Sequence, residues 1–150
     1  MMPEATTRVG SKPAGLRNAA LILVLAVLSG CNGPLFMLPG GRLSGPEAPL
    51  TAAVIPDEGG VAVLETRPDD PYSVNVGIAV VDGVIHIDPA AERRWYQHLL
   101  DDPDVRIRFE GDPVVYTARV EPVRDPGVLE RFEQTRNVLK LVPRATPSNS

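Results

Sequence analysis

Ten consecutive apolar residues near the start of the chain, Ala19–Leu28, limit what the rest of it can form. Residues 1–18, which precede this run, are rich in polar side chains and carry a net positive charge. A helix needs about 20 apolar residues to cross the hydrocarbon core of a bilayer, so the run is about half as long as a spanning segment. This order of segments predicts a signal peptide over residues 1–30, and it leaves enough chain for one domain.

Cys31 directly follows the predicted leader and is the only cysteine of the chain. A single cysteine excludes a disulfide within the chain and every metal or redox site that is built on a cysteine pair. The tetrapeptide Leu28-Ser29-Gly30-Cys31 resembles the lipobox of bacterial lipoproteins. The resemblance implies cleavage before Cys31 and lipidation of its thiol; the alternative is an incidental cysteine after an ordinary leader.

Lipid on Cys31 would decide where the protein resides. Each buried methylene contributes about 0.8 kcal/mol, so two or more acyl chains hold a protein on a membrane without a spanning helix. We therefore expect an exported protein that is anchored to a bacterial membrane on its periplasmic or extracytoplasmic face. The sequence leaves open whether this is the inner or the outer membrane.

The charge of the chain bears on its partners. The net charge is −4, and because residues 1–30 carry three basic residues and one acidic residue, the remainder carries −6. Neutralisation of phosphates supplies most of the affinity of nucleic-acid-binding proteins, and an acidic domain without a basic stripe cannot provide it. We expect no nucleic-acid partner.

Residues 31–58 combine the lipidated cysteine with a segment rich in proline and glycine. Regular helices and central strands do not tolerate this composition, so it predicts a flexible, semi-extended tether of about 3 Å per residue. The apolar residues Leu35–Leu38 within it would either lie on the membrane or pack on the domain, and the sequence does not choose between the two. The prolines and glycines of residues 32–50 are Gly33, Pro34, Pro39, Gly40, Gly41, Gly45, Pro46 and Pro49.

Apolar and alternating runs from residue 59 onward predict β-strands joined by tight turns. Asp82-Gly83 is a strong signal for a two-residue hairpin turn, and it separates two runs rich in Val and Ile. Gly111-Asp112-Pro113 predicts a second hairpin, whose first strand alternates apolar and charged residues. The expected strands are 61–65, 73–81, 84–87, 105–110, 114–121 and 138–142.

Two Asp-Pro pairs predict helix starts, because Asp caps a helix N-terminus and Pro suits its first position. Asp88-Pro89 would begin a helix that ends near Asp102-Pro103, and Asp125-Pro126 would begin a shorter one. Together with the strands, these helices predict a mainly β fold of the α+β class over residues 59–143, a small antiparallel barrel with two short helices. Residues 144–150 are expected to form a disordered tail.

Residues 95–105 read Trp-Tyr-Gln-His-Leu-Leu-Asp-Asp-Pro-Asp-Val. This stretch resembles the W-y-x-N-L-x-x-x-P-x-V segment of deazaflavin-dependent nitroreductase-like proteins. These belong to a wider group of flavin-binding split barrels that includes the pyridoxamine phosphate oxidases. The resemblance extends over residues 60–143 and implies a split antiparallel β-barrel, a homodimer and a groove for FMN or deazaflavin.

The same resemblance places four residues at the cofactor. Arg93 and Arg94 fall where relatives carry basic groups, Trp95 follows them, and Ser73 ends the segment that matches the family's phosphate-binding loop. No catalytic residue follows from it. A solvated helix face is the alternative reading for the two arginines, and a core position is the alternative for Trp95.

A metal site is not expected. His86 and His98 with the nearby Asp88 offer ligand types that metals use, but their spacing matches no common metal-binding signature.

The loop between the first two strands of the domain separates two functional hypotheses. It contains Asp69 and Asp70 between two prolines, where the family has glycines. Carboxylates repel a phosphate and proline removes an amide donor, so cofactor binding is disfavoured at this loop. The chain is thus either a flavin- or deazaflavin-dependent oxidoreductase of the nitroreductase-like kind, or a non-enzymatic module that binds another ligand or a protein.

Overall fold

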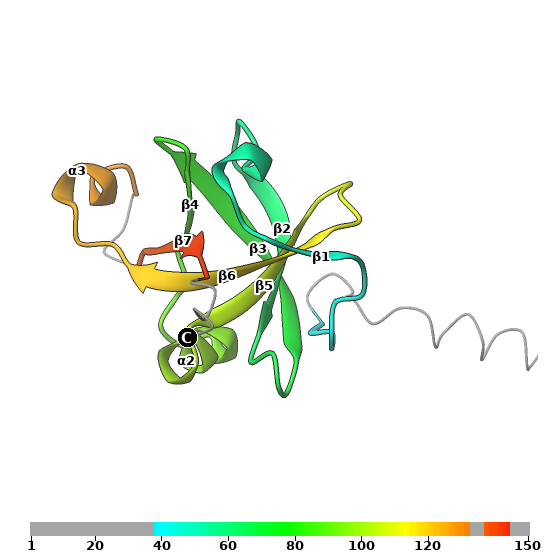
Figure 1. Ribbon diagram of the computed structural model, residues 1–150. Helices are drawn as coiled ribbons and strands as arrows, with labels where there is room; N and C mark the ends of the chain where they lie inside the picture. Colours follow the sequence, from blue (N-terminus) through cyan, green and yellow to red (C-terminus); the bar gives the residue numbers. More distant parts are fainter. Residues whose placement is uncertain (1–37, 133–136, 145–150) are drawn as a thin grey trace, which may run out of the picture. The chain divides into compact units, whose positions relative to one another are not determined.

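The computed structural model describes residues 38–132 and 137–144 of the chain. Six strands close into an antiparallel barrel in the order β6–β5–β2–β3–β4–β7, and β7 returns to pair with β6 (Figure 1). Helix α2 connects β4 to β5, and α3 connects β6 to β7. The elements are β1 Glu47–Pro49, η1 Ala52–Val54, β2 Gly60–Thr66, β3 Tyr72–Val81, β4 Val84–Ile87, α2 Arg94–Asp101, β5 Asp104–Phe109, β6 Val115–Pro122, α3 Pro126–Leu129 and β7 Leu139–Pro143.

The mainly antiparallel barrel with two short helices is thereby confirmed. The predicted signal peptide, Cys31 and residues 145–150 of the expected tail lie outside the described residues. In the part of the chain that the structure describes, no helix has both the length and the apolar character needed to cross a membrane.

The tight turns explain the pairing of neighbouring strands. Asp82 and Gly83 both have positive φ, 52° and 75°, which is the geometry of the hairpin turn that joins β3 to β4. Gly111 has φ 77° in the turn between β5 and β6. Both hairpins lie where the turn residues predicted them.

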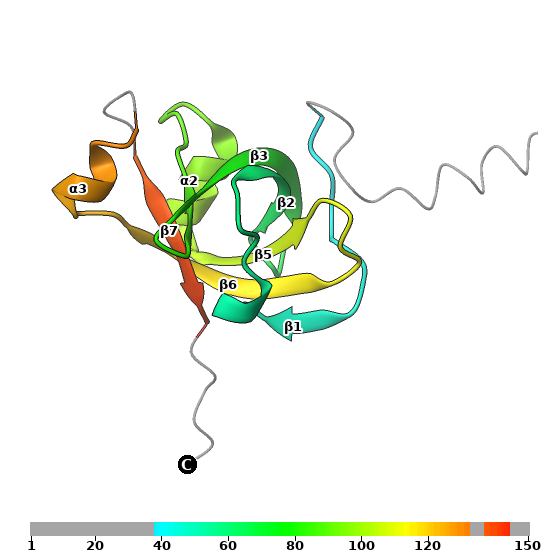
Figure 2. The same ribbon diagram turned by 90° about the horizontal axis from the view of Figure 1, so that it is seen from above.

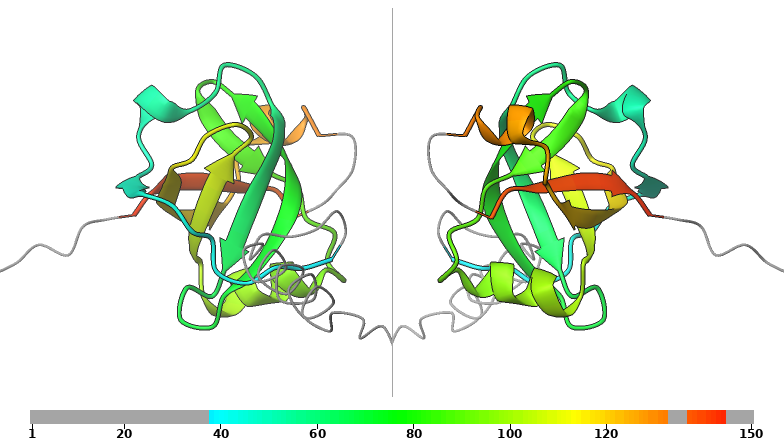
Figure 3. Two further views of the ribbon diagram at one scale, coloured as in Figure 1. Left: turned by 90° about the vertical axis from the view of Figure 1, so that its right-hand side faces the viewer. Right: turned by 90° about the vertical axis from the view of Figure 1, so that its left-hand side faces the viewer.

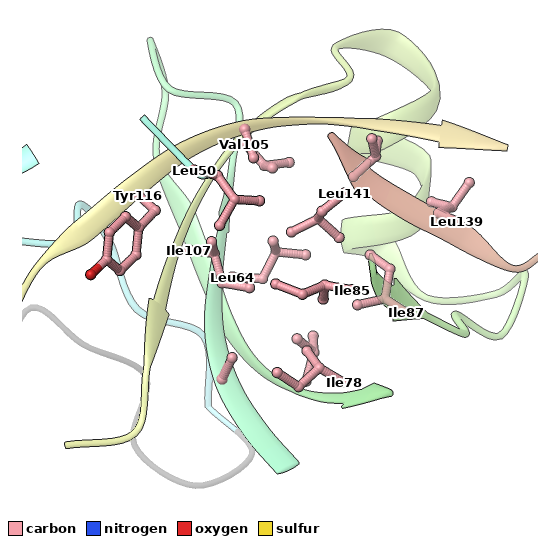
Figure 4. Close-up of a cluster of buried hydrophobic side chains, with 14 of the residues drawn as sticks. Leu50, Leu64, Ile78, Ile85, Ile87, Val105, Ile107, Tyr116, Leu139 and Leu141 are labelled. Atoms are coloured by element: carbon pink, nitrogen blue, oxygen red, sulfur yellow. The ribbon is translucent and has the colours of Figure 1, made fainter. Parts of the chain in front are cut away.

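Alternation along the strands separates an apolar interior from a polar exterior. Leu64 of β2 faces Ile107 of β5 across the sheet, and both are fully buried inside the barrel (Figure 4). Their neighbours in sequence, Glu65 and Arg106, point to the opposite side of the same strands. The interior is completed by Leu50, Ala62, Val76, Ile78, Ile85, Ile87, Leu99, Val105, Tyr116, Ala118, Val120, Leu139 and Leu141.

Helix α2 begins later than the sequence predicted. Asp88-Pro89 leads instead into a turn, in which the Arg93 N–H donates to the carbonyl of Ala90 at 3.1 Å, and the helix starts at Arg94. The chain must first cross from the end of β4 to the end of the barrel, where Leu99 can be buried. The second Asp-Pro pair is confirmed as a helix start: an Asp125 carboxylate oxygen accepts from the Gly127 N–H at 2.9 Å, and Pro126 opens α3.

Residues 40–50, which we call the strap, were expected to belong to the tether, but they pack against the barrel. Leu43 and Leu50 are only 2% and 1% exposed. Glu47–Pro49 forms β1, which runs parallel to the first residues of β6 and continues the edge along which β7 pairs farther on (Figure 2). Prolines are tolerated in such a short edge strand because no partner requires the missing N–H, so composition alone did not reveal it.

The strap covers a buried ion pair on the outside of the barrel. Nη1 of Arg106 lies 2.8 Å from both carboxylate oxygens of Glu65, and the two side chains are 5% and 0% exposed. The backbone of Leu43 completes the pair, because its N–H donates to Glu65 and its carbonyl accepts from Arg106 Nη2 at 3.0 Å. Glu47 of β1 forms a second ion pair with Arg106. The pair therefore fastens the strap to β2 and β5.

Candidate ligand groove

A groove of about 840 Å³ opens where the barrel is split. The second half of β3 pairs with β4 through residues 79–81, whereas β4 does not reach residues 72–78. The chain after β4 instead turns away through residues 88–93 to reach α2, and the groove lies between this segment and β3. Its lining is Leu38, Tyr72, Val74, Asn75, Val76, Gly77, Asp88, Pro89, Ala90, Glu92, Arg93, Arg94 and Trp95.

Three of the four predicted cofactor-binding residues line this groove together. Arg93, Arg94 and Trp95 are consecutive and lie at the start of α2, so the late start of the helix is what brings all three to the groove. Both arginines are exposed, and Trp95 is half-buried against the core cluster. Positive charge beside an aromatic ring suits a ligand that joins an anionic group to a flat ring system.

Ser73, the fourth predicted residue, does not line the groove. It is fully buried, and its backbone exchanges hydrogen bonds with Gly40, at 2.9 Å from the Ser73 N–H and 2.8 Å to its carbonyl. Its hydroxyl has no hydrogen-bond partner among the described residues. Ser73 lies opposite Glu65, on the outer face of the sheet, which places its side chain on the side that the strap covers.

In the acidic loop after β2, residues 67–71, the side chain and backbone of Arg67 are bonded to Asp70. Arg67 has φ 52° and forms an ion pair of 3.0 Å with Asp70, while its carbonyl accepts from the Asp70 N–H at 2.9 Å. Arg42 of the strap donates to the carbonyl of Pro68 at 2.6 Å. Residues 67–71 are absent from the described lining of the groove. The position that matches the family's phosphate-binding loop therefore presents no cation to the groove.

A buried histidine connects α2 to β2 and to β3, of which β3 lines the groove. His98 is 9% exposed; its Nδ1 lies 3.1 Å from Thr66 Oγ1, and its ring meets that of Tyr72 edge-on at 4.9 Å between centroids. Tyr72 in turn lines the groove. This contact holds the helix that carries Arg94 against the ends of β2 and β3. No sequence pattern predicted the contacts of Thr66 and Tyr72 with His98, because they arise only through tertiary packing.

We expect the stability of the domain to fall as the pH is lowered through the range where histidine titrates. Burial, followed by the charges of Arg67 and Arg94, lowers the pKa of His98 below its ordinary value of 6.5. As the pH falls below about 6.5, His98 becomes protonated in the unfolded chain while it remains neutral in the folded chain. Protonation therefore favours unfolding. The melting temperature should drop between about pH 7.5 and about pH 5.5.

The variant His98→Asn tests whether His98 causes the loss of stability at low pH. It should flatten the pH dependence without abolishing it, because burial also lowers the pKa of His86. An unchanged slope in His98→Asn would contradict the assignment.

The two histidines do not form a common site. His86 lies on β4, where its Nδ1 is 2.9 Å from the carbonyl of Val84 and its ring lies 6.0 Å from that of Phe132. It borders a different cavity, together with Lys140 and Arg124. Among the described residues, no group of three or more His, Cys, Asp or Glu side chains is placed to hold a metal ion.

Comparison with known proteins gives a likeness of fold. No protein-family model matches the chain, and no curated protein is significantly similar to it in sequence. A candidate pyridoxamine 5'-phosphate oxidase from Listeria innocua has 18% identity and a TM-score of 0.44 over 57% of this chain and 84% of its own. Another, from Corynebacterium glutamicum, has 20% identity and a TM-score of 0.42 over 69% of this chain and 92% of its own. The likeness to these structures concerns the fold alone.

Proposed function

We propose that this chain is a lipid-anchored envelope protein whose groove binds an anionic ligand with a flat ring system, of the flavin or deazaflavin class. One observation carries the proposal: Arg93, Arg94 and Trp95 border a single groove at the split of the barrel. Lipid on Cys31 and export remain predictions from the sequence, as does the homodimer that the family resemblance implies.

The contacts of the two arginines support an anionic ligand. Both side chains are exposed, and among the described residues neither takes part in an ion pair. A guanidinium without an internal partner can make charge-assisted hydrogen bonds to a phosphate or carboxylate. Val74, Val76 and Trp95 supply an apolar wall for a ring.

A second candidate function follows from the closed acidic loop. Because Arg67 is engaged with Asp70, the loop offers no cradle for the phosphate of a nucleotide. The barrel would then be a non-enzymatic binding module, in which the same groove takes a ligand other than a flavin. Oxidoreductase activity is therefore proposed only if a flavin or deazaflavin binds.

Titration of the protein with FMN and with the deazaflavin cofactor tests the proposal. Trp95 is the only tryptophan of the chain and lines the groove, so a bound flavin should quench its emission. Arg94→Ala should weaken binding about 10-fold or more, since a hydrogen bond to a charged group contributes about 1.5–3 kcal/mol.

Arg124→Ala is the matched control, because Arg124 is exposed but borders a different cavity. It should bind as the unmodified chain does. Saturable binding that Arg94→Ala weakens and Arg124→Ala leaves intact supports the redox hypothesis. Absence of binding with both cofactors refutes that hypothesis and leaves the non-enzymatic module.

A further inference from the structure

We infer that the end of the barrel that carries the groove faces the bilayer, with Arg93 and Arg94 on anionic lipid headgroups. The inference rests on the lipid anchor at Cys31 that is part of the proposed function.

The strap determines where the membrane-proximal chain joins the barrel. Gly40 is joined to Ser73 of β3 by two backbone hydrogen bonds, and the buried Leu43 is joined through its backbone to Glu65 and Arg106. The chain is therefore held against β3 at Gly40, and Leu38 also forms an isolated β-bridge. Two residues earlier, Leu38 is 65% exposed and lines the groove itself. The connection to Cys31 thus begins at the mouth of the groove.

The remaining tether is short in relation to the domain. Leu38 is seven positions after Cys31, and at about 3.3–3.6 Å per residue such a segment reaches roughly 25 Å at full extension. A domain of this length has a radius of gyration of about 13 Å and is therefore roughly 35 Å across. Since the tether is shorter than the domain is wide, the opposite end of the barrel cannot rest on the bilayer, which favours an orientation with the attached end near it. The opposite end, which carries η1, lies away from α2 in both Figure 1 and Figure 3.

The chemistry of this end suits a lipid surface. Leu38 and Trp95 supply apolar and amphipathic side chains of the kind that lie at membrane interfaces. Arg93 and Arg94 lie beside them and are exposed, as is the neighbouring Glu92; each basic residue near an anionic leaflet gains about 1 kcal/mol. The apolar residue next to the groove and the two cations lie around the point where the tether begins.

Quenching of Trp95 by lipids tests the orientation. The full, lipidated chain is reconstituted in vesicles of phosphatidylethanolamine and phosphatidylglycerol that contain a lipid spin-labelled near its headgroup. We expect strong quenching of Trp95. The control is Trp95→Phe combined with Ala53→Trp, which moves the only tryptophan to an exposed position in η1; its quenching should be several-fold weaker.

Two further variants separate the tether from the charge. Twenty Gly/Ser residues inserted after Asn32 should abolish most of the quenching, and Arg93→Glu with Arg94→Glu should reduce it in the anionic vesicles. Equal quenching of the two tryptophan positions, or quenching that the insertion leaves unchanged, overturns the inference. The mass of the purified chain is measured in parallel: a mass without acyl chains refutes the lipid anchor and the inference with it, whereas an acylated chain without quenching refutes the inference alone.

Discussion

Replacing Arg106 with Met is expected to lower the free energy of unfolding by about 3–5 kcal/mol, the cost of leaving one charge of a buried pair without its partner. Glu65 is fully buried, and among the described residues its carboxylate would keep only the Leu43 N–H as a hydrogen-bond partner. The strap would also lose the bond from Arg106 to the Leu43 carbonyl. Urea unfolding followed by the emission of Trp95 measures the loss.

A compensating variant separates the charge from the packing. Adding Glu65→Gln to Arg106→Met removes the buried charge but retains an oxygen for the Leu43 N–H, so the double variant should recover most of the lost stability. Arg119→Met is the exposed control: its ion pair with Asp104 joins side chains that are 50% and 16% exposed, and its loss should cost about 0–1 kcal/mol. A loss for Arg106→Met as small as that of Arg119→Met would show that the pair does not fasten the strap.

The second large effect is expected in the barrel interior. Ile107→Ala should cost about 2–5 kcal/mol, because Ile107 is 0% exposed and packs opposite Leu64 (Figure 4). Strands held by the barrel's closure cannot easily move to fill the space, so a cavity is left. A domain of this size has only about 5–15 kcal/mol of stability in total, so the variant should be close to unfolding at physiological temperature.

Graded substitutions at and away from this position check the cause. Ile107→Val removes a single methylene and should cost about 0.5–1.5 kcal/mol. Leu100→Ala on α2 is the exposed control, since Leu100 is 59% exposed, and it should change the stability by no more than about 0.5 kcal/mol. Similar losses for Ile107→Ala and Leu100→Ala would contradict the assignment of Ile107 to the core.

Local signals predicted most of the barrel. The turn at Asp82-Gly83 requires positive φ at both positions, and Asp-Gly is a pair that favours this geometry. Alternation along Val105–Phe109 likewise predicted which side of β5 faces the barrel interior, because the side-chain period of a strand is two. Such features depend on residues that are neighbours in the chain, and the structure contains them where they were predicted.

The position of α2 and the role of the strap depended on distant residues. Asp88-Pro89 carries the local signal of a helix start, yet the helix begins at Arg94, where the chain has reached the end of the barrel. The proline-rich composition of residues 40–50 excludes a central strand, but it does not reveal that the strap binds to the barrel. That binding depends on Glu65 of β2 and Arg106 of β5, which are distant from the strap in sequence.

By itself, then, the sequence determined the antiparallel strands and their hairpins, because these follow from short-range backbone geometry and periodicity; Arg93, Arg94 and Trp95 were predicted through the family resemblance. Only the tertiary structure decided that these three residues share one groove, that Ser73 is buried away from it, and that the strap joins the barrel beside Leu38. These are long-range contacts, and their energy comes from burial and charge pairing between elements whose separation along the chain hides them from any local pattern.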